Sequence, residues 1–365
     1  MKLISYFGNK KIIINICIYA LIFYLLIHSK VITSSISSTT NLFTTKILPA
    51  LFPYLLITEL LINSGKINNL SIGLDSFLAK LFHVPKNTIS CIIIGFLLGY
   101  PNAAKYILKL YDTKQIDSKI ATKLISFTSN ANISYIIATV GIGILGSIEI
   151  GIILAISHFL AAIIIGLCYV PLYNNSIIQQ TLLNSNSFKK IYSPFELLYS
   201  SIGSTLKTLA YIFAYTIIFS FIPIVLLNHF ELPDLIKSLI IGLFELSNGI
   251  NSISTLNINL NIKIVLASFI LSFSSIMIIV QIFSFAYKAK VKFKNLLLFK
   301  FLHGLLSCII TYIIIHLIYT PTINVFSNTD IHLIKVNILP STVYMFSLTV
   351  IVLLILLLFR KKRQG

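Results

Sequence analysis

Long apolar runs separated by short polar segments make up most of the chain. An α-helix rises about 1.5 Å per residue, so roughly 20 apolar residues cross a bilayer. Together with their flanks, eight runs predict transmembrane helices, at residues 12–27, 47–62, 135–145, 151–169, 209–227, 265–283, 296–319 and 343–359. The polar stretch Ser34–Thr45 predicts a loop after the first helix.

Two further apolar runs are interrupted. Ile89–Leu98 is broken by Gly99-Tyr100-Pro101-Asn102, and its two arms are each too short to span a membrane. Lysines flank both arms, which predicts a re-entrant helical hairpin entering from the cytoplasm. The second run begins at Leu235 and is broken at Glu245-Leu246-Ser247-Asn248-Gly249. It follows an acidic loop, which predicts a hairpin entering from outside.

Hairpins of opposite orientation indicate an inverted repeat. The pattern therefore predicts an all-α polytopic membrane protein with about eight transmembrane helices plus two oppositely oriented re-entrant helical hairpins. Transporters built on inverted repeats bind solutes at helix breaks near the bilayer midplane. We expect the two hairpin tips to approach each other there and to enclose a polar cavity with Asn130 and Gln281.

Composition supports the membrane assignment and limits the function classes. The 365 residues are 57% hydrophobic and only 10% charged, whereas soluble domains carry about 25% charged residues. The net charge of +18 comes from lysines dispersed over loops, which favours cytoplasmic loops and termini over nucleic-acid binding. The sequence has no CxxC, HExxH, GxSxG or P-loop motif, so we expect no enzyme, metal site or cofactor.

Clusters of small polar residues mark the candidate solute site. Such side chains either bind a polar solute or hold helices together, and both interpretations stay open for each residue. The candidates beside the two hairpin tips are Gly99, Tyr100, Pro101, Asn102, Ser129, Asn130, Asn132, Glu245, Ser247, Asn248, Gly249, Ser274, Ser275 and Gln281.

Three ionisable residues in apolar surroundings are candidates for ion coupling. Glu59 and Glu245 are the two carboxylates that lie in strongly apolar runs, where an unpaired charge costs a few kcal/mol. Glu59 could also be a carboxylate at headgroup level. His303, near Lys300, is the histidine most suited to a functional role, with interfacial packing as the alternative, and His158 is expected to pack between helices.

Ordered motifs over residues 45 to 320 resemble those of the sporulation integral membrane protein YlbJ family. Gly99–Lys105 resembles its GYPxGAK motif, and Phe127-Thr128-Ser129-Asn130 resembles its FTNxSNP motif. Further matches to the family pattern are Pro53 with Glu59 and Gly65, Gly242–Glu245 with Gly249, Phe273–Ser275 with Gln281, and Lys300–Gly304. Ala103 and Ser275 stand where the family has Gly, Ile133 where it has Pro, and Leu98 where it has a small polar residue.

The resemblance implies a protein of endospore-forming bacteria that is required for spore cortex formation. It implies nucleoside-recognition gate domains, as in nucleoside transporters, and a location in the mother-cell or forespore membrane with both termini cytoplasmic. The domains expected are residues 1–45 (N-terminal span and external loop), 46–173 (first gate-like half), 174–207 (connector and amphipathic helix), 208–320 (second gate-like half) and 321–365 (C-terminal span and basic tail).

Two functions follow from these features. The first is a permease for an unidentified polar solute, with or without a coupling ion. The alternative is a non-transporting membrane scaffold for assembly of the spore envelope. The bilayer is the expected environment in both cases, and the sequence leaves open whether the chain acts alone or as a homo-oligomer.

Overall fold

The computed structural model describes residues 26–64, 75–97, 99–169, 193–227 and 230–318, together with residues 15, 19 and 22–24. These belong to one compact unit, Met1–Pro321. Every regular element in them is helical, which confirms the all-α prediction. The predictions for the first span at 12–27 (in most of its length), the connector at 174–190 and the C-terminal segment 321–365 lie outside the described residues.

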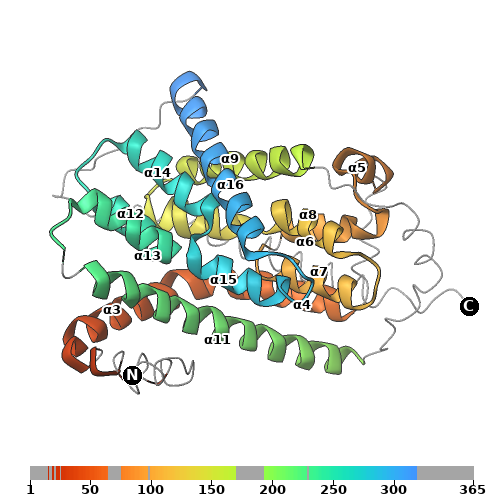
Figure 1. Cartoon of the computed structure of the whole chain (residues 1–365), viewed down its shortest axis with the longest axis horizontal. Coiled ribbons are helices and arrows are strands. Elements are labelled where there is room, and N and C mark those ends of the chain that lie inside the picture. Colours follow the sequence, from red (N-terminus) through yellow and green to blue (C-terminus); the bar gives the residue numbers. More distant parts are fainter. Residues whose placement is uncertain are drawn as a thin grey trace, which may run out of the picture. The chain divides into compact units, whose positions relative to one another are not determined.

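The helices follow the chain in the order shown in Figure 1. Their bounds are α3 Ser29–Leu42, η1 Phe43–Ile47, α4 Leu48–Asn63, α5 Asp75–Phe82, η3 Lys86–Thr88, α6 Ile89–Leu97, α7 Asn102–Asp112, α8 Ser118–Thr128, η4 Tyr135–Ile144, α9 Ile148–Cys168, α11 Pro194–Leu227, α12 Asp234–Phe244, α13 Leu246–Thr255, α14 Leu260–Phe273, α15 Ser275–Ala286, α16 Phe293–Ile313 and η6 Ile314–Ile318.

Five helical stretches of the described residues are long and apolar enough to cross a membrane. They are Ser29–Asn63, Ile148–Cys168, Pro194–Leu227, Leu260–Ala286 and Phe293–Leu317. A sixth candidate is the pair Asp75–Phe82 and Lys86–Leu97, which is bent by 96°. The chain is therefore a multi-pass membrane protein, while the count of eight spans, the re-entrant hairpins and the inverted repeat stay predictions.

The predicted loop Ser34–Thr45 is wrong, because this stretch is helical through α3 and η1. Its hydroxyl groups bond back to carbonyls of the same helix: Thr44 Oγ1 donates to Thr40 O at 2.9 Å, and Thr45 Oγ1 donates to Asn41 O at 2.6 Å. Serine and threonine can thus satisfy themselves inside a membrane helix, and their polarity alone does not indicate a loop.

Helix α11 is one continuous helix of 34 residues that runs along α3 and α4 (Figure 1). The amphipathic stretch expected to end near Lys207 and the span expected from Leu209 are parts of it, and the predicted boundary at 207 lies inside it. A capping box starts α11, since Ser193 Oγ accepts from Glu196 N and Glu196 Oε2 accepts from Ser193 N. Pro194 at its first position needs no N–H partner.

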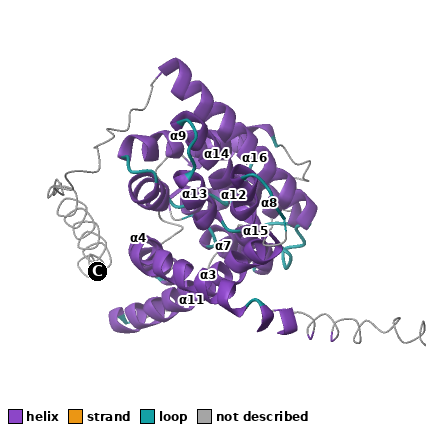
Figure 2. Cartoon of the chain, turned by 90° about the vertical axis from the view of Figure 1, so that its left-hand side faces the viewer, coloured by secondary structure: helices purple, strands orange, loops and turns teal. Residues whose placement is uncertain are grey.

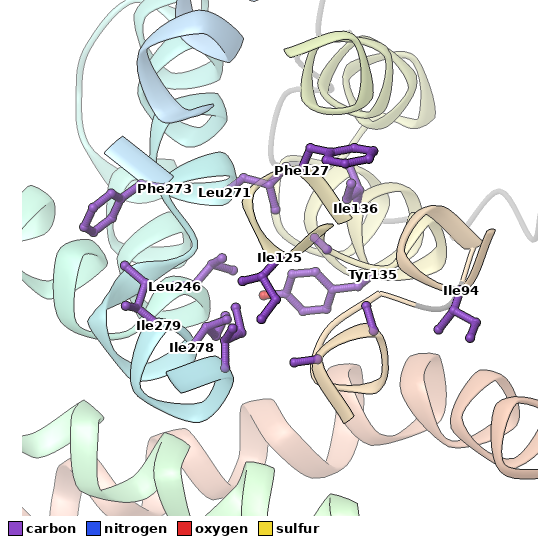
Figure 3. Close-up of a cluster of buried hydrophobic side chains, with 14 of the residues drawn as sticks. Ile94, Ile125, Phe127, Tyr135, Ile136, Leu246, Leu271, Phe273, Ile278 and Ile279 are labelled. Atoms are coloured by element: carbon purple, nitrogen blue, oxygen red, sulfur yellow. The ribbon is translucent and has the colours of Figure 1, made fainter. Parts of the chain in front are cut away.

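The core forms where α9, α14 and α16 pack against one another and against α8 and η4 (Figure 2). Figure 3 shows its centre, where Leu246, Ile278 and Ile279 face Ile125 and Tyr135. These five side chains are buried. Close backbone contact supports the core at Gly141, where an added Cβ would lie 2.4 Å from Gly151 Cα.

Four of the helix breaks in the described residues contain predicted site residues: those between α6 and α7, α8 and η4, α12 and α13, and α14 and α15. One of them differs from the sequence prediction. The run 265–283 is not an uninterrupted helix, because Ser274 adopts a left-handed conformation with φ of 71°.

Candidate functional site

The first helix pair, α6–α7, docks its tip onto the break between α8 and η4. Gly99 has φ of +70°, and Tyr100 N donates to Asn130 O at 2.8 Å. A Cβ added at Gly99 would lie 2.8 Å from Asn132 N. Glycine is required here because both the backbone conformation and the close approach exclude a side chain.

Polar atoms without hydrogen-bond partners gather around this docked tip. Asn102, the first residue of α7, is fully buried, and neither its amide nitrogen nor its amide oxygen has a partner. Ser129 Oγ and Asn130 Oδ1 are also buried and unpartnered. A buried polar group without a partner costs about 1–3 kcal/mol. In folded proteins such groups are usually satisfied by an ordered water, an ion or a ligand, so these atoms mark a place where a polar molecule can bind.

Neighbouring polar groups at the same break serve the backbone instead. Asn130 Nδ2 donates to Phe127 O at 2.9 Å, and Asn132 Oδ1 accepts from Ser134 N at 2.7 Å. These bonds hold the segment between α8 and η4 in shape. Of the predicted residues here, Asn102, Ser129 and Asn130 still have capacity to bind a solute.

The tip of the second helix pair, α12–α13, satisfies its own polar groups. Glu245 caps α13: its Oε1 accepts from Ser247 N at 3.0 Å and its Oε2 from Asn248 N at 2.6 Å. Ser247 Oγ bonds to Tyr135 OH at 2.8 Å, and Asn248 Nδ2 donates to Thr39 Oγ1 at 3.1 Å. The carboxylate lies at the positive end of the helix dipole, which stabilises it.

Gly249 lies near the beginning of α13, where its N–H donates to Glu245 O at 3.1 Å. A Cβ added to it would lie 2.0 Å from Gly242 Cα. Its role in the structure is to let α12 and α13 pack closely.

A buried lysine connects the break between α8 and η4 with the break between α14 and α15. Lys300 Nζ donates to Ser129 O and, at 3.2 Å, to Ser274 Oγ. Ser275 beside it has φ of 53° and a buried hydroxyl without a partner. The sequence signal for Lys300 is a lone cation in an apolar run, three residues before the predicted candidate His303.

His303 pairs with His158, as the ring centroids are 4.6 Å apart. His303 Nε2 bonds to His158 O at 2.8 Å. His158 Nε2 accepts from Ala131 N at 3.1 Å, and its Nδ1 bonds to Ser272 Oγ at 2.8 Å. His158 is thus satisfied between helices, as expected.

An open pocket of about 150 Å³ lies beside the first tip. Glu59 is buried and pairs with Lys105 at 3.4 Å, and Lys105 Nζ also donates to Thr208 Oγ1 at 2.6 Å. Gln281 Nε2 is buried without a partner. The pocket is lined by Pro101, Lys105, Thr208, Tyr211, Ile212, Tyr215, Gln281, Ser284 and Phe285.

The structure brings only some of the predicted residues together in the pocket. Gln281 and Pro101 line one pocket, but Asn130 is not part of its lining. Within the described residues, no cluster of three or more His, Cys, Asp or Glu side chains could hold a metal ion. The available groups are hydroxyls, amides and one buried ammonium, which suit hydrogen bonding to a polar solute.

Comparison with known proteins gives one informative result. No protein-family model matches the chain, and no solved structure matches it. The chain is 24% identical over 306 residues to "Sporulation integral membrane protein YlbJ" of Bacillus subtilis (strain 168), covering 75% of each protein. This similarity and the apolar helices place the chain among integral membrane proteins related to sporulation, and support its resemblance to the YlbJ family.

Proposed function

We propose that this protein is a permease for a small polar solute, which binds where the α6–α7 tip meets the break between α8 and η4. The observation that carries the proposal is the set of buried, unpartnered groups on Asn102, Ser129 and Asn130. They offer amide donors, amide acceptors and a hydroxyl, so the solute must itself both donate and accept hydrogen bonds.

Two further features support solute binding at this place. Helix α7 begins at Asn102 without a side-chain cap, so the positive end of its dipole faces the tip. The pocket that contains Pro101 and Lys105 lies beside the same tip.

The proposed mechanism is alternating access around this site. The two helix pairs would be re-entrant hairpins of opposite orientation, each packed against a broken helix, with both termini in the cytoplasm. Such broken helices move as gates in inverted-repeat transporters. The similarity to a sporulation integral membrane protein supports a role in sporulation, and we propose that this role is in spore cortex formation, in the mother-cell or forespore membrane.

Ligand-dependent thermal unfolding of the purified full chain tests the proposal. The solutes to screen are nucleosides, peptidoglycan precursors, amino acids and dipicolinate. A ligand at 100 times its Kd stabilises the folded state by about 2.7 kcal/mol. We expect Asn102→Ala and Asn130→Ala to abolish this shift, and Asn248→Ala, whose amide is bonded to Thr39, to retain it.

Solute counterflow in proteoliposomes then tests movement across the membrane. Counterflow that is lost in Asn130→Ala and kept in Asn248→Ala supports the permease. An identical thermal shift or an identical flux in both variants would contradict the assigned site.

The scaffold function is favoured by one observation, the internal hydrogen bonding at the second tip of Glu245, Ser247 and the amide nitrogen of Asn248. Complementation of a strain that lacks the protein distinguishes the two. A scaffold requires that Asn102→Ala and Asn130→Ala both restore cortex formation, whereas a permease requires that both fail.

A further inference from the structure

Lys300 is the one cation that joins two helix breaks among the described residues. Helix α8 ends at Thr128 with Ser129 as its C-cap, and α14 ends at Phe273 with Ser274 as its C-cap. Lys300 Nζ donates to the carbonyl of the first C-cap and, at 3.2 Å, to the hydroxyl of the second. One ammonium therefore occupies the C-terminal ends of two half-helices.

The buried ammonium contacts two helix ends. Lys300 is 1% exposed, and the buried carboxylate of Glu59 pairs with Lys105 instead. A helix C-terminus carries about −0.5 elementary charge. These partial negative charges attract the ammonium, which reaches one helix end through a carbonyl and the other through a side-chain hydroxyl.

This arrangement has the features of a coupling-ion site. In transporters with broken helices, unwound carbonyls and the C-terminal ends of half-helices coordinate the coupling ion, Na⁺ or H⁺. Here the same two ends hold a covalently attached cation. On the permease function proposed above, we propose that Lys300 replaces a bound metal cation and that the proton it carries is the coupling ion.

The proton has a definite effect on the structure. With the proton, the ammonium makes charge-assisted bonds that tie the two breaks together. When the proton leaves, the partial charges of the two helix ends no longer attract the neutral amine, and the breaks can separate. Protonation thus favours the bridged state, and deprotonation favours the open state.

The titratable groups around Lys300 have other hydrogen-bond partners, so the coupling proton is assigned to the lysine. Helix α16 packs against α9, α14, α8 and α15. His158 on α9 accepts from Ala131 N through Nε2, so this nitrogen carries no proton, and His303 on α16 bonds to the carbonyl of His158. On α8, Lys123 is directed to Gly166 O and Tyr169 O, and on α14, Lys263 donates to Ser254 O.

The remaining ionisable groups of these helices are exposed or half-buried, so none of them takes the place of Lys300 as the buried proton carrier. Glu149 on α9 and Lys119 on α8 are exposed and have interactions of their own, and Lys294 on α16 is exposed. Cys168 is exposed and Cys308 half-buried, and Tyr312 is exposed. Helix α15 carries no ionisable side chain.

Hydrogen exchange of the folded full chain as a function of pH tests the proposal without any solute. After correction for intrinsic exchange, amides of 129–134 and 274–276 should exchange about tenfold faster on the alkaline side of the transition, because charge-assisted bonds are replaced by neutral ones. Lys300→Met should remove this pH dependence. Lys123→Met, at the other fully buried lysine, should retain it. Retention of the transition in Lys300→Met, or its absence in the unmodified protein, would overturn the proposal.

Chemical rescue tests the replacement of a metal cation. The unmodified protein should unfold at the same temperature in sodium and in choline chloride. Lys300→Ala should unfold at a higher temperature in methylammonium chloride than in choline chloride, since the small ammonium can occupy the vacated position. Stabilisation of the unmodified protein by sodium, or no rescue of Lys300→Ala, would contradict it. Both experiments can succeed where no solute is transported, so failure of the permease function is recognised separately.

Discussion

The tips of the two helix pairs differ in side-chain capping and in the hydrogen bonding of their polar side chains. In α12–α13 the carboxylate of Glu245 caps the second helix, and the polar side chains that follow have partners. In α6–α7 the second helix begins without a side-chain cap, and both amide atoms of Asn102 lack partners. The buried polar atoms of the second tip have partners, whereas those of Asn102 at the first tip do not. The comparison teaches that equal polarity in the sequence does not mean an equal capacity to bind a solute.

The largest expected effect is at the glycine of the first tip. Gly99→Ala should destabilise the protein by about 2–5 kcal/mol, because it combines a left-handed conformation with a Cβ forced against backbone. The contact is Asn132 N at 2.8 Å. Denaturant unfolding in detergent measures the loss. Gly203→Ala is the control, since nothing lies within 4 Å of its added Cβ, and this helical position should gain about 0.5–1 kcal/mol. Equal effects of the two substitutions would mean that the tip is not docked as described.

Glu245→Gln tests whether the second tip is structural. Two backbone N–H groups bond to the carboxylate, and hydrogen bonds to a charged group are worth about 1.5–3 kcal/mol. We expect a loss of about 2 kcal/mol in the free energy of unfolding, with the pH dependence of hydrogen exchange unchanged. Unaltered stability together with a lost pH response would instead make Glu245 the coupling group.

The helix that is interrupted between α14 and α15 should become more stable when Ser275, which has a left-handed backbone conformation, is replaced by glycine. Ser275→Gly removes a φ of 53° from a residue with a side chain and deletes a hydroxyl without a partner. The expected gain is about 1–2 kcal/mol in unfolding free energy. Ser274→Gly relieves a similar conformation but loses the contact with Lys300, so its gain should be smaller. A larger gain in Ser274→Gly would argue against that contact.

These breaks also show which parts of the fold the sequence could predict. The break at Gly99 was predictable because only one residue separates Gly99 from Pro101, and Asp117, a residue type favoured at N-caps, does cap α8. The break at Ser274 carries neither residue, so an apolar run concealed it. The helix across Ser34–Thr45 was mistaken for a loop because hydroxyl groups can bond within a helix.

The candidate site was predictable only as a set of residue types. The sequence indicated that small polar residues near the breaks matter, and it marked Asn102, Ser129 and Asn130 among them. It could not separate these from Asn248, whose amide finds its partner Thr39 209 residues away in the chain, nor from Asn132, whose amide oxygen accepts from Ser134 N within the same break. Lys300 was passed over because its partners come from breaks 171 and 26 residues away in the chain.

The smallest effect on stability should give the sharpest test of the comparison. Asn102→Ala deletes two unpartnered polar atoms, which is favourable, but leaves a cavity in the core, which is unfavourable, so the free energy of unfolding should change by less than about 1 kcal/mol. Asn248→Ala breaks a bond to Thr39 of 3.1 Å and should cost about 1 kcal/mol. The order should reverse for ligand-induced stabilisation, which Asn102→Ala loses and Asn248→Ala keeps. Unfolding measured with and without solute gives both values for each variant. One variant could instead show the larger change in both unfolding free energy and ligand-induced stabilisation. The same residue would then contribute to binding and to stability, and the proposed difference between the two tips would be wrong.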